Sequence, residues 1–249
     1  MYALITGASS GIGKAIAYEL ASRKYDLILV ARRESELKQI KTEIENTYKN
    51  KVVLKVMDLS IAENCHKLHD ETTDLHPSIV INNAGFGRVG FFEDIELQSE
   101  LNMIDLNIVA LHILTKLFVG SMREGVIMNV ASMAGVFPTP MMASYAATKA
   151  YVLNFSRAVN YELKKSGRPI KVLSLTPGPV VTEFGEVAQT KQKMQGMSAK
   201  RCAQIAVKGL LKGKSVIAPG FLMKTMRFLL KIIPFGMALP AAYKIQNKK

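Results

Sequence analysis

Short apolar runs alternate with longer amphipathic stretches along most of the chain. The runs are rich in Val, Ile and Leu and occupy residues 3–6, 26–31, 52–57, 79–81, 126–130 and 215–218. Many stretches between them carry apolar residues at helical spacing, as Ile16, Ala17 and Leu20 do in 14–23. Strands that alternate with helices at this pace predict an α/β fold, a three-layer, doubly wound parallel sheet of the Rossmann type. Ligands are then expected at the carboxyl ends of the strands.

Length and composition agree with one large domain. The chain has 249 residues, of which 49% are hydrophobic and 21% charged, so it can bury a sizeable core and is not a disordered chain. Its two cysteines, Cys65 and Cys202, lie far apart, which argues against a disulfide framework and favours a reducing compartment. Neither a basic leader nor a long apolar segment is visible at the start, so we expect no cleaved signal peptide and a cytoplasmic protein.

A glycine-rich turn joins the first apolar run to the first helical stretch. Its glycines, Gly7, Gly11 and Gly13, have the spacing Gly-x-x-x-Gly-x-Gly, one residue looser than the usual dinucleotide pattern. Such a turn lets the backbone approach a pyrophosphate at the N-terminus of the helix. A tight turn without a ligand is the alternative.

The second apolar run ends at Arg32 and Arg33. In dinucleotide-binding folds an acidic residue near this point accepts the hydroxyls of the adenosine ribose, whereas arginine accommodates a 2′-phosphate. Because the acid is missing and two arginines are present, the sequence favours NADP(H) over NAD(H). The alternative is that both are ordinary charges before the next helix, although basic residues are unfavourable at a helix N-terminus.

The pair Tyr145 and Lys149 follows the apolar run 126–130, with Ser132 just past the end of that run. On a helix, residues four positions apart share a face. An ammonium near a phenol favours the phenolate, so we expect the pKa of Tyr145 to fall from about 10 towards neutrality. A general acid/base that acts on an alcohol or a carbonyl needs such a group. Taken alone, this spacing also arises by chance on surface helices.

Two further features leave alternatives open. Asn107 lies near the middle of an apolar helical stretch, 101–118, where an amide usually bonds to a neighbouring backbone, and a functional role is at least as well supported. Cysteine and histidine also occur together, as Cys65, His66, His69 and His76. Their spacing matches no common zinc pattern, so we expect no metal site.

The order of these motifs resembles that of the short-chain dehydrogenases/reductases, over roughly residues 1–220. The motifs that carry the resemblance are Thr6-Gly7-Ala8-Ser9-Ser10-Gly11-Ile12-Gly13, Asp58-Leu59, Asn82-Asn83-Ala84-Gly85, Asn107, Ser132, Tyr145-x-x-x-Lys149 and Pro177-Gly178.

The resemblance implies a catalytic set of four residues. Tyr145 would protonate the carbonyl oxygen as hydride arrives from the nicotinamide, and Lys149 would lower its pKa and hold the nicotinamide ribose. Ser132 would hydrogen-bond the substrate oxygen, and Asn107 would fix a water in the proton relay behind the lysine. No position of this set departs from the family pattern.

The resemblance also implies the cofactor contacts, from the glycine-rich turn through the strand ends to the segment after residue 176. The expected cofactor-binding residues are Gly7, Ser9, Ser10, Gly11, Ile12, Gly13, Arg32, Arg33, Asp58 (adenine), Asn82, Ala84, Gly85 (the floor under the adenosine), Tyr145, Lys149, Pro177, Gly178, Val180 and Thr182 (the nicotinamide carboxamide). In the family, the polar segment at 183–196 is a mobile lid over the substrate.

The net charge of +13 is confined to the last quarter of the chain. Residues 1–186 contain 20 Lys and Arg and 20 Asp and Glu, whereas residues 187–249 contain 13 Lys and Arg and no acid. Within 221–233, Lys224, Arg227 and Lys231 form a narrow basic stripe on an otherwise apolar helix. This C-terminal extension, 221–249, could lie in a membrane interface through residues 221–243. It could equally pack on a partner subunit or cover an apolar substrate pocket. Nucleic acid is not expected, because aromatic and basic residues are not interleaved.

The combined interpretation is an NADP-dependent carbonyl reductase acting on a lipophilic ketone or fatty-acyl-like substrate. The alternatives are a reductase of small polar carbonyls and a non-catalytic dinucleotide-binding regulatory protein. Family members are commonly dimers or tetramers, and the apolar helix near Asn107 could form such an interface.

Overall fold

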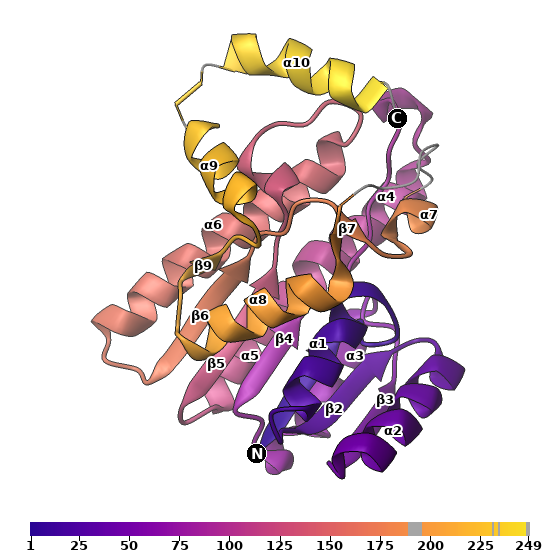
Figure 1. The fold of residues 1–249 in the computed structure, drawn as a ribbon, viewed down its shortest axis with the longest axis vertical. Helices are drawn as coiled ribbons and strands as arrows, with labels where there is room; N and C mark the ends of the chain where they lie inside the picture. Colours follow the sequence, from indigo (N-terminus) through magenta and orange to yellow (C-terminus); the bar gives the residue numbers. More distant parts are fainter. Residues whose placement is uncertain (189–195, 231, 234, 248–249) are drawn as a thin grey trace.

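The computed structural model describes residues 1–188, 196–230, 232–233 and 235–247. Its centre is a seven-stranded parallel sheet in the order β3-β2-β1-β4-β5-β6-β9 (Figure 1). The strands are β1 (Tyr2–Thr6), β2 (Asp26–Ala31), β3 (Val52–Val56), β4 (Ile79–Asn82), β5 (Gly125–Val130), β6 (Ile170–Leu175) and β9 (Val216–Ile217). Because the strand order reverses between β1 and β4, the sheet is doubly wound, and the predicted α/β fold is confirmed.

Helices cover both faces of the sheet and complete the three layers (Figure 1). On one face lie α1 (Gly11–Ala21), α2 (Glu34–Tyr48) and α8 (Ala199–Leu211), which pack through Ile16, Leu20, Ile40 and Val207. On the other lie α3 (Ala62–Asp70), α5 (Leu111–Ser121) and α6 (Ala143–Lys165), which pack through Leu68, Leu114, Phe118 and Leu163. The inner strands are therefore buried on both sides, which explains why they are continuous apolar runs without alternation.

The helix that carries Asn107 is continuous from Leu97 to Ser121. It consists of α4 (Leu97–Ile104), the π-helical segment η3 (Asp105–Ala110) and α5. Among the described residues it is the one helix long and apolar enough to cross a membrane, with a mean hydropathy of 1.6. Since Leu114 and Phe118 are buried against the sheet, this segment packs as a core helix.

The C-terminal residues form two helices at the end of the sheet where the strands have their carboxyl ends (Figure 1). They are α9 (Phe221–Leu229) and α10 (Phe235–Asn247). α9 contacts the turn η4 (Met133–Val136), and Tyr243 of α10 packs on Phe91 at a centroid distance of 6.4 Å. α10 contains Pro240 within the helix, although proline is unfavourable in a helix interior.

Candidate active site

The glycine-rich turn runs from the end of β1 into the first turn of α1. Gly7 and Gly11 have φ values of +63° and +55°, which glycine adopts without strain. Gly13 lies so close to Gly7 that a Cβ on it would stand 2.3 Å from the Gly7 carbonyl oxygen. No side chain caps the N-terminus of α1, where Ser10 is extended, and its first turn contains no acid. This open, positively polarised helix end fits the pyrophosphate of a dinucleotide.

Asn83, which the motif order does not distinguish from its neighbours, holds this turn in place. Its Nδ2 donates to the carbonyl oxygens of Thr6 at 3.0 Å and Gly7 at 3.2 Å. The Thr6 hydroxyl oxygen accepts from the backbone N–H groups of Asn83 and Ala84, each at 3.0 Å. The ends of β1 and β4 are therefore tied together at the point where the strand order reverses.

Asn82 is directed into the interior. Its Nδ2 donates to Asn129 Oδ1 at 2.9 Å and to Thr115 Oγ1 at 3.2 Å, and Asn129 in turn donates to Ser156 Oγ. All four side chains are buried. The side chain of Asn82 thus braces the sheet from within, and only its backbone is left to line a cofactor site.

The two arginines after β2 contact different parts of the strand-end surface. Arg32 Nη1 lies 3.4 Å from Asp58 Oδ2. Partial burial raises the pKa of the Asp58 carboxyl, but hydrogen bonds from Ser60 and the charge of Arg32 outweigh it and hold that pKa below its usual value. Arg33 donates through Nε to Ser9 Oγ at 3.3 Å and pairs through Nη1 with Glu183 at 2.9 Å. Arg33 therefore links the glycine-rich turn to the segment that follows β6.

Ser132 and Tyr145 meet because the turn after β5 packs directly on α6. Ser132 precedes η4 and its Oγ accepts from the Ala134 N–H at 3.1 Å. Gly135 lies against the backbone of Lys149, where a Cβ would stand 2.4 Å from the carbonyl carbon. Tyr145, in the first turn of α6, is 8% exposed and hydrogen-bonds with Ser132. Two hydroxyl groups are thus paired at the carboxyl end of the central strands.

Lys149 lies one turn further along α6, with Nζ 5.8 Å from the centroid of the Tyr145 ring. Its Nζ donates to the carbonyl oxygen of Val130 at 2.9 Å. Burial lowers the pKa of Lys149 to about 8, and burial raises the pKa of Tyr145 to about 12 despite the hydrogen bond from Ser132. The expectation that Lys149 brings the Tyr145 pKa towards neutrality is therefore wrong, because desolvation outweighs the hydrogen bond with Ser132 and the Lys149 ammonium bonds to Val130.

Asn107 is fully buried and anchors the segment after β4. Its Oδ1 accepts from the Phe86 N–H at 3.1 Å, and its Nδ2 donates to the Phe86 carbonyl at 2.9 Å and to Thr148 Oγ1 at 3.1 Å. A Cβ on Gly85 would lie 2.7 Å from Asn107 Oδ1 and 3.4 Å from Lys149 Nζ. Asn107 therefore bonds to a neighbouring backbone, as a core amide does, and also lies beside the catalytic candidates. Thr148, which the sequence did not single out, connects it to α6.

The segment after β6 lies against the turn that follows Ser132. The Pro177 carbonyl accepts from the Met133 N–H at 2.9 Å. Gly178 packs closely on Met223 of α9, so that a Cβ on it would stand 2.3 Å from the Met223 sulfur. α9 is thereby packed directly onto the loop that contains Pro177 and Gly178.

The next residues reach both the glycine-rich turn and the tyrosine. Val180 is buried in β7 (Val180–Val181), which pairs with β8 (Met197–Ser198). A Cβ on Gly11 would lie 3.3 Å from the Thr182 methyl group. Phe184, in α7 (Phe184–Val187), packs on Tyr145 at a centroid distance of 5.4 Å and was not predicted. Residues 189–195 of the expected lid, 183–196, lie outside the described residues.

The described residues contain no group of three or more His, Cys, Asp or Glu that could hold a metal ion. His69, from the discounted cluster, bonds through Nε2 to Ser121 at 2.9 Å. Cys65 is buried and donates to the Leu59 carbonyl. His69 and Cys65 therefore serve the packing of α3, His69 through its bond to α5 and Cys65 through its burial in the core.

The sequence profile of the short chain dehydrogenase family matches residues 1–193. The chain belongs to this family. Short-chain dehydrogenases are oxidoreductases that use a nicotinamide dinucleotide, and the resemblance inferred from the motif order is confirmed.

Two relatives and one solved structure illustrate the relationship. The chain is 32% identical over 237 residues to hydroxysteroid dehydrogenase-like protein 1 of Gallus gallus, covering 92% of this chain and 70% of that protein. It is 34% identical over 193 residues to very-long-chain 3-oxoacyl-CoA reductase-B of Danio rerio, covering 75% and 61%. The chain thus spans about three-fifths of the length of that reductase. A short-chain dehydrogenase from Sphingobium yanoikuyae in complex with NADPH has a TM-score of 0.81 at 30% identity, covering 94% and 96%.

Proposed function

We propose that this short-chain dehydrogenase is an NADPH-dependent reductase that converts a lipophilic ketone, most specifically a 3-oxoacyl thioester, to the secondary alcohol. The observation that carries the proposal is the pairing of the Ser132 and Tyr145 hydroxyls beside Lys149, next to the uncapped glycine-rich turn. These groups supply a proton donor, an oxygen-binding hydroxyl and a dinucleotide cradle at one end of the sheet.

In this mechanism Ser132 and Tyr145 both hydrogen-bond the substrate carbonyl oxygen, and Tyr145 transfers its proton to that oxygen. When bound at the glycine-rich turn, NADPH would supply the hydride for the carbonyl carbon. A Tyr145 pKa of about 12 keeps the phenol protonated at neutral pH, which suits a proton donor in the reductive direction. Ser132 stabilises the negative charge that develops on the oxygen. Lys149 positions the nicotinamide ribose, and Asn107 positions the Phe86 segment and a water of the proton relay.

The cofactor assignment rests on the residues of the strand ends. We assign the pyrophosphate to the turn Gly7–Gly13, the 2′-phosphate to Arg32 and Arg33, and the adenine to Asp58. Ala84, Gly85 and the backbone of Asn82 line the adenosine, and Pro177, Gly178, Val180 and Thr182 line the nicotinamide. Arg32 supports NADPH over NADH because its side chain is 71% exposed at the end of β2, and arginine binds phosphate through several N–H groups.

The substrate class rests on the apolar surroundings of Tyr145. Met103 and Met142 are buried against its ring, and Phe86 and Phe184 pack on the same cluster. Such side chains favour an alkyl chain over a sugar or a hydroxy acid. The relative from Danio rerio is named as a very-long-chain 3-oxoacyl-CoA reductase, and a very-long-chain 3-oxoacyl-CoA is a substrate of this kind. A reductase of small polar carbonyls and a non-catalytic dinucleotide-binding protein are the competing functions, and the presence of all four catalytic candidates speaks against the second.

The same proposal includes the setting in which the enzyme works. The buried, unpaired Cys65 and Cys202 suit a reducing, cytoplasmic environment. Leu97 and Leu101, on the outer side of α4, are 68% and 42% exposed, which suits contact with a second copy in a dimer or tetramer.

Replacement of Tyr145 tests the assignment directly. Tyr145→Phe removes the transferable proton but keeps the ring, so turnover should fall about 10²- to 10⁴-fold while the Kd for NADPH stays within about twofold. Tyr161→Phe, on the same helix but 61% exposed, is the matched control and should retain activity. Undiminished turnover in Tyr145→Phe, with NADPH still bound, would refute the role of this residue.

A further inference from the structure

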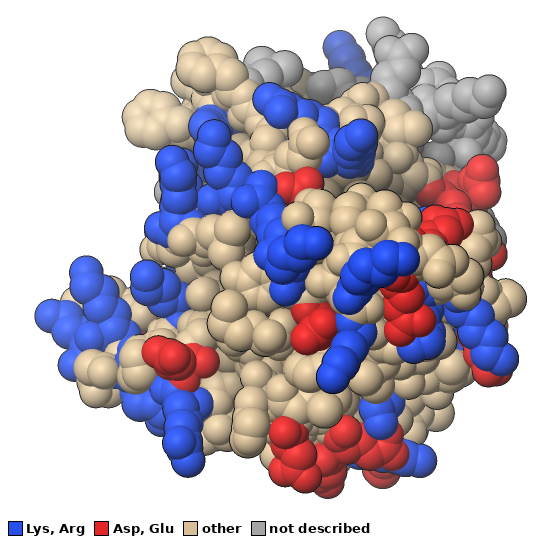
Figure 2. Space-filling view, turned by 60° about the horizontal axis from the view of Figure 1, so that its bottom comes forward, with Lys and Arg blue, Asp and Glu red and all other residues tan. Residues whose placement is uncertain are grey.

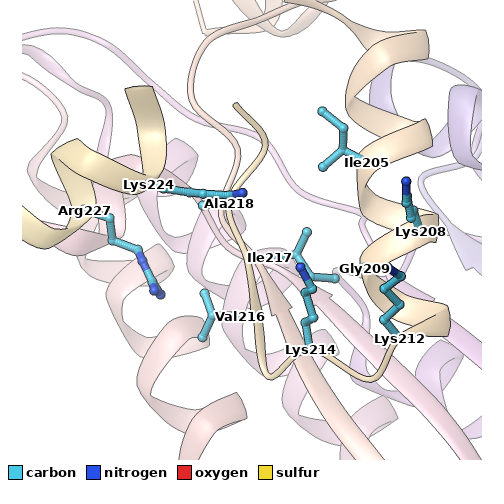
Figure 3. A pocket seen from close by; sticks show the side chains of 10 residues that line it. All are labelled: Ile205, Lys208, Gly209, Lys212, Lys214, Val216, Ile217, Ala218, Lys224 and Arg227. Carbon is cyan, nitrogen blue, oxygen red and sulfur yellow. The ribbon is translucent and has the colours of Figure 1, made fainter. Parts of the chain in front are cut away.

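A cleft of about 380 Å³ lies between α8 and α9, over the edge strand β9 (Figure 3). Figure 3 shows Lys208 on α8 and Lys212 just past its end, Lys224 and Arg227 on α9, and Lys214 between the two helices. The remaining lining is apolar or glycine: Ile205, Gly209, Val216, Ile217 and Ala218. We call this the basic cleft. Half of its lining residues are cationic and none is acidic.

The cations of the basic cleft lack counter-charges within the described part of the chain. None of the five forms an ion pair with an acidic side chain there. Burial, together with the nearby charge of Arg157, lowers the pKa of Arg227. A further ammonium, that of Lys171, lies beside Gly213, between the lining residues Lys212 and Lys214 in the sequence. Several like charges held together without an acid attract an anion from outside the molecule.

Figure 2 shows that Lys and Arg side chains gather on the upper left of that view, where Asp and Glu are few. The clustering agrees with the distribution along the sequence, since the last acidic residue of the chain is Glu186 and all lining residues follow it. Five of the 13 Lys and Arg residues in 187–249 line the basic cleft.

Large apolar side chains are exposed to solvent on α9, the helix that forms one wall of the basic cleft. Phe221 is 85% exposed, Phe228 65% and Leu229 47%, and Ile232 just beyond α9 is 65% exposed. Lys224 and Arg227 of the same helix line the cleft. An apolar helix surface beside a cluster of cations is the arrangement by which helices rest in the interface of an anionic bilayer.

We propose that the basic cleft binds the phosphate headgroup of an anionic phospholipid, with the exposed apolar residues of α9 resting in the bilayer beside it. The cations neutralise the phosphate, and Phe221, Phe228 and Ile232 leave water as the helix enters the interface. A nucleic acid would engage the cations only and would leave these apolar side chains in water. A protein partner would need acidic and apolar surfaces in the same arrangement, a more specific requirement than any anionic membrane surface imposes.

Vesicle flotation tests this proposal with the full chain. The probes are vesicles of phosphatidylcholine alone and vesicles with about 30% phosphatidylglycerol. Wild type should float with the anionic vesicles only, and Lys224→Glu/Arg227→Glu should reduce the vesicle-bound fraction about tenfold or more. The matched control, Lys51→Glu/Arg123→Glu, makes the same change of charge next to the amino ends of β3 and β5 and should stay within about twofold of wild type. Equal losses in both pairs would overturn the cleft as the site, because only overall charge would matter.

A second variant and soluble ligands complete the test. Lys212→Gln/Lys214→Gln leaves α9 unchanged and should also weaken flotation, so a folding defect in α9 cannot imitate the result. NADPH affinity should be unaltered in every variant, which separates membrane binding from the proposed reductase activity. Stabilisation by inorganic phosphate or free coenzyme A, without vesicle binding, would assign the cleft to a soluble phosphate ligand and overturn the lipid proposal. Binding to an oligonucleotide without vesicle binding, or formation of a dimer that Phe228→Ser dissolves, would overturn it as well.

Discussion

Lys149 is an ammonium group held in a buried site whose only described acceptor is the Val130 carbonyl. Its pKa is lowered from 10.5 to about 8 by burial. The unfolded chain therefore binds more protons than the folded one between pH 8 and 10.5, so the stability of the wild type rises with pH across that window. Below pH 8 the folded protein carries the full cost of the buried charge.

Lys149→Met should for this reason be more stable than wild type at pH 7, by roughly 1–2 kcal/mol after loss of the hydrogen bond to Val130 is subtracted. The advantage should fade as the pH rises from 8 to 10.5. Urea unfolding at pH 7 and at pH 10.5 measures the difference in stability between Lys149→Met and wild type. The exposed Lys164→Met on the same helix is the control and should show no such dependence on pH. A Lys149→Met protein that is less stable than wild type at pH 7 would mean that the site accommodates the charge.

The predicted preference for NADPH over NADH is tested most directly at Arg32. Arg32→Ala should weaken NADPH binding about 10- to 100-fold, the value of a charge-assisted phosphate contact, and change NADH binding less than about twofold. Fluorescence titration with both cofactors measures the two constants. The exposed Lys38→Ala on α2 should leave both unchanged. Equal losses for NADPH and NADH in Arg32→Ala would remove the basis for the preference.

At this scale the motif order located Ser132, Tyr145, Lys149 and the glycines correctly at one end of the sheet, because each follows a strand that the apolar pattern marks. It did not reveal that the Asn82 side chain is directed into the core, whereas the Asn83 side chain holds the glycine-rich turn. Adjacent residues at a strand end point to opposite sides, and which one enters the core depends on Thr115 and Asn129, distant in sequence. The prediction for the pKa of Tyr145 was wrong for a similar reason. Burial of Tyr145 raises this pKa, and that burial depends on residues distant in sequence.

Among the helices, α1 and α5 show how the same residue type has opposite effects. Gly13→Ala would place a Cβ within 2.3 Å of the Gly7 carbonyl oxygen, so either the glycine-rich turn or α1 must shift. We expect a loss of about 1–3 kcal/mol in stability and weaker dinucleotide binding. The control Gly120→Ala, in α5 with nothing within 4 Å, should gain about 0.5–1 kcal/mol. Thermal unfolding with and without NADPH compares them, and a Gly13→Ala protein as stable as wild type would contradict the close packing.

The pattern of apolar runs predicted six of the seven sheet strands to within one or two residues, because strands buried on both faces are continuous apolar segments. Three elements were not predicted. Strand β6 was not among the predicted runs, and Lys171 and Ser174 interrupt its apolar residues. The π-helical segment η3 has the same apolar spacing as its neighbours, and its altered hydrogen bonding is not encoded by periodicity. Helix α10 contains Gly236 and Pro240, which local propensity counts against a helix.

For the whole molecule, charge and apolar surface are unevenly distributed. The glycine-rich turn and the hydroxyls of Ser132 and Tyr145, which we propose hold the dinucleotide and the substrate oxygen, lie at the carboxyl end of the sheet. α9 and α10 lie at the same end, within the part of the sequence that contains no acidic residue (Figure 1). The apolar cluster around Tyr145 and the exposed apolar side of α9 both suit a substrate that partitions into lipid. A reductase of this form would meet its substrate at the surface where the substrate is concentrated.

The most direct measurement is the oxidation of NADPH, with NADH in parallel, against ketones that range from small and polar to long-chain 3-oxoacyl thioesters. The account predicts turnover with NADPH and a kcat/KM that rises with chain length, about tenfold or more for several added methylenes. Tyr145→Phe should lower this activity about 10²- to 10⁴-fold. Turnover of small polar carbonyls in preference to the long-chain thioesters would contradict the proposed substrate class, and no oxidation of either cofactor by any ketone would contradict the reductase itself.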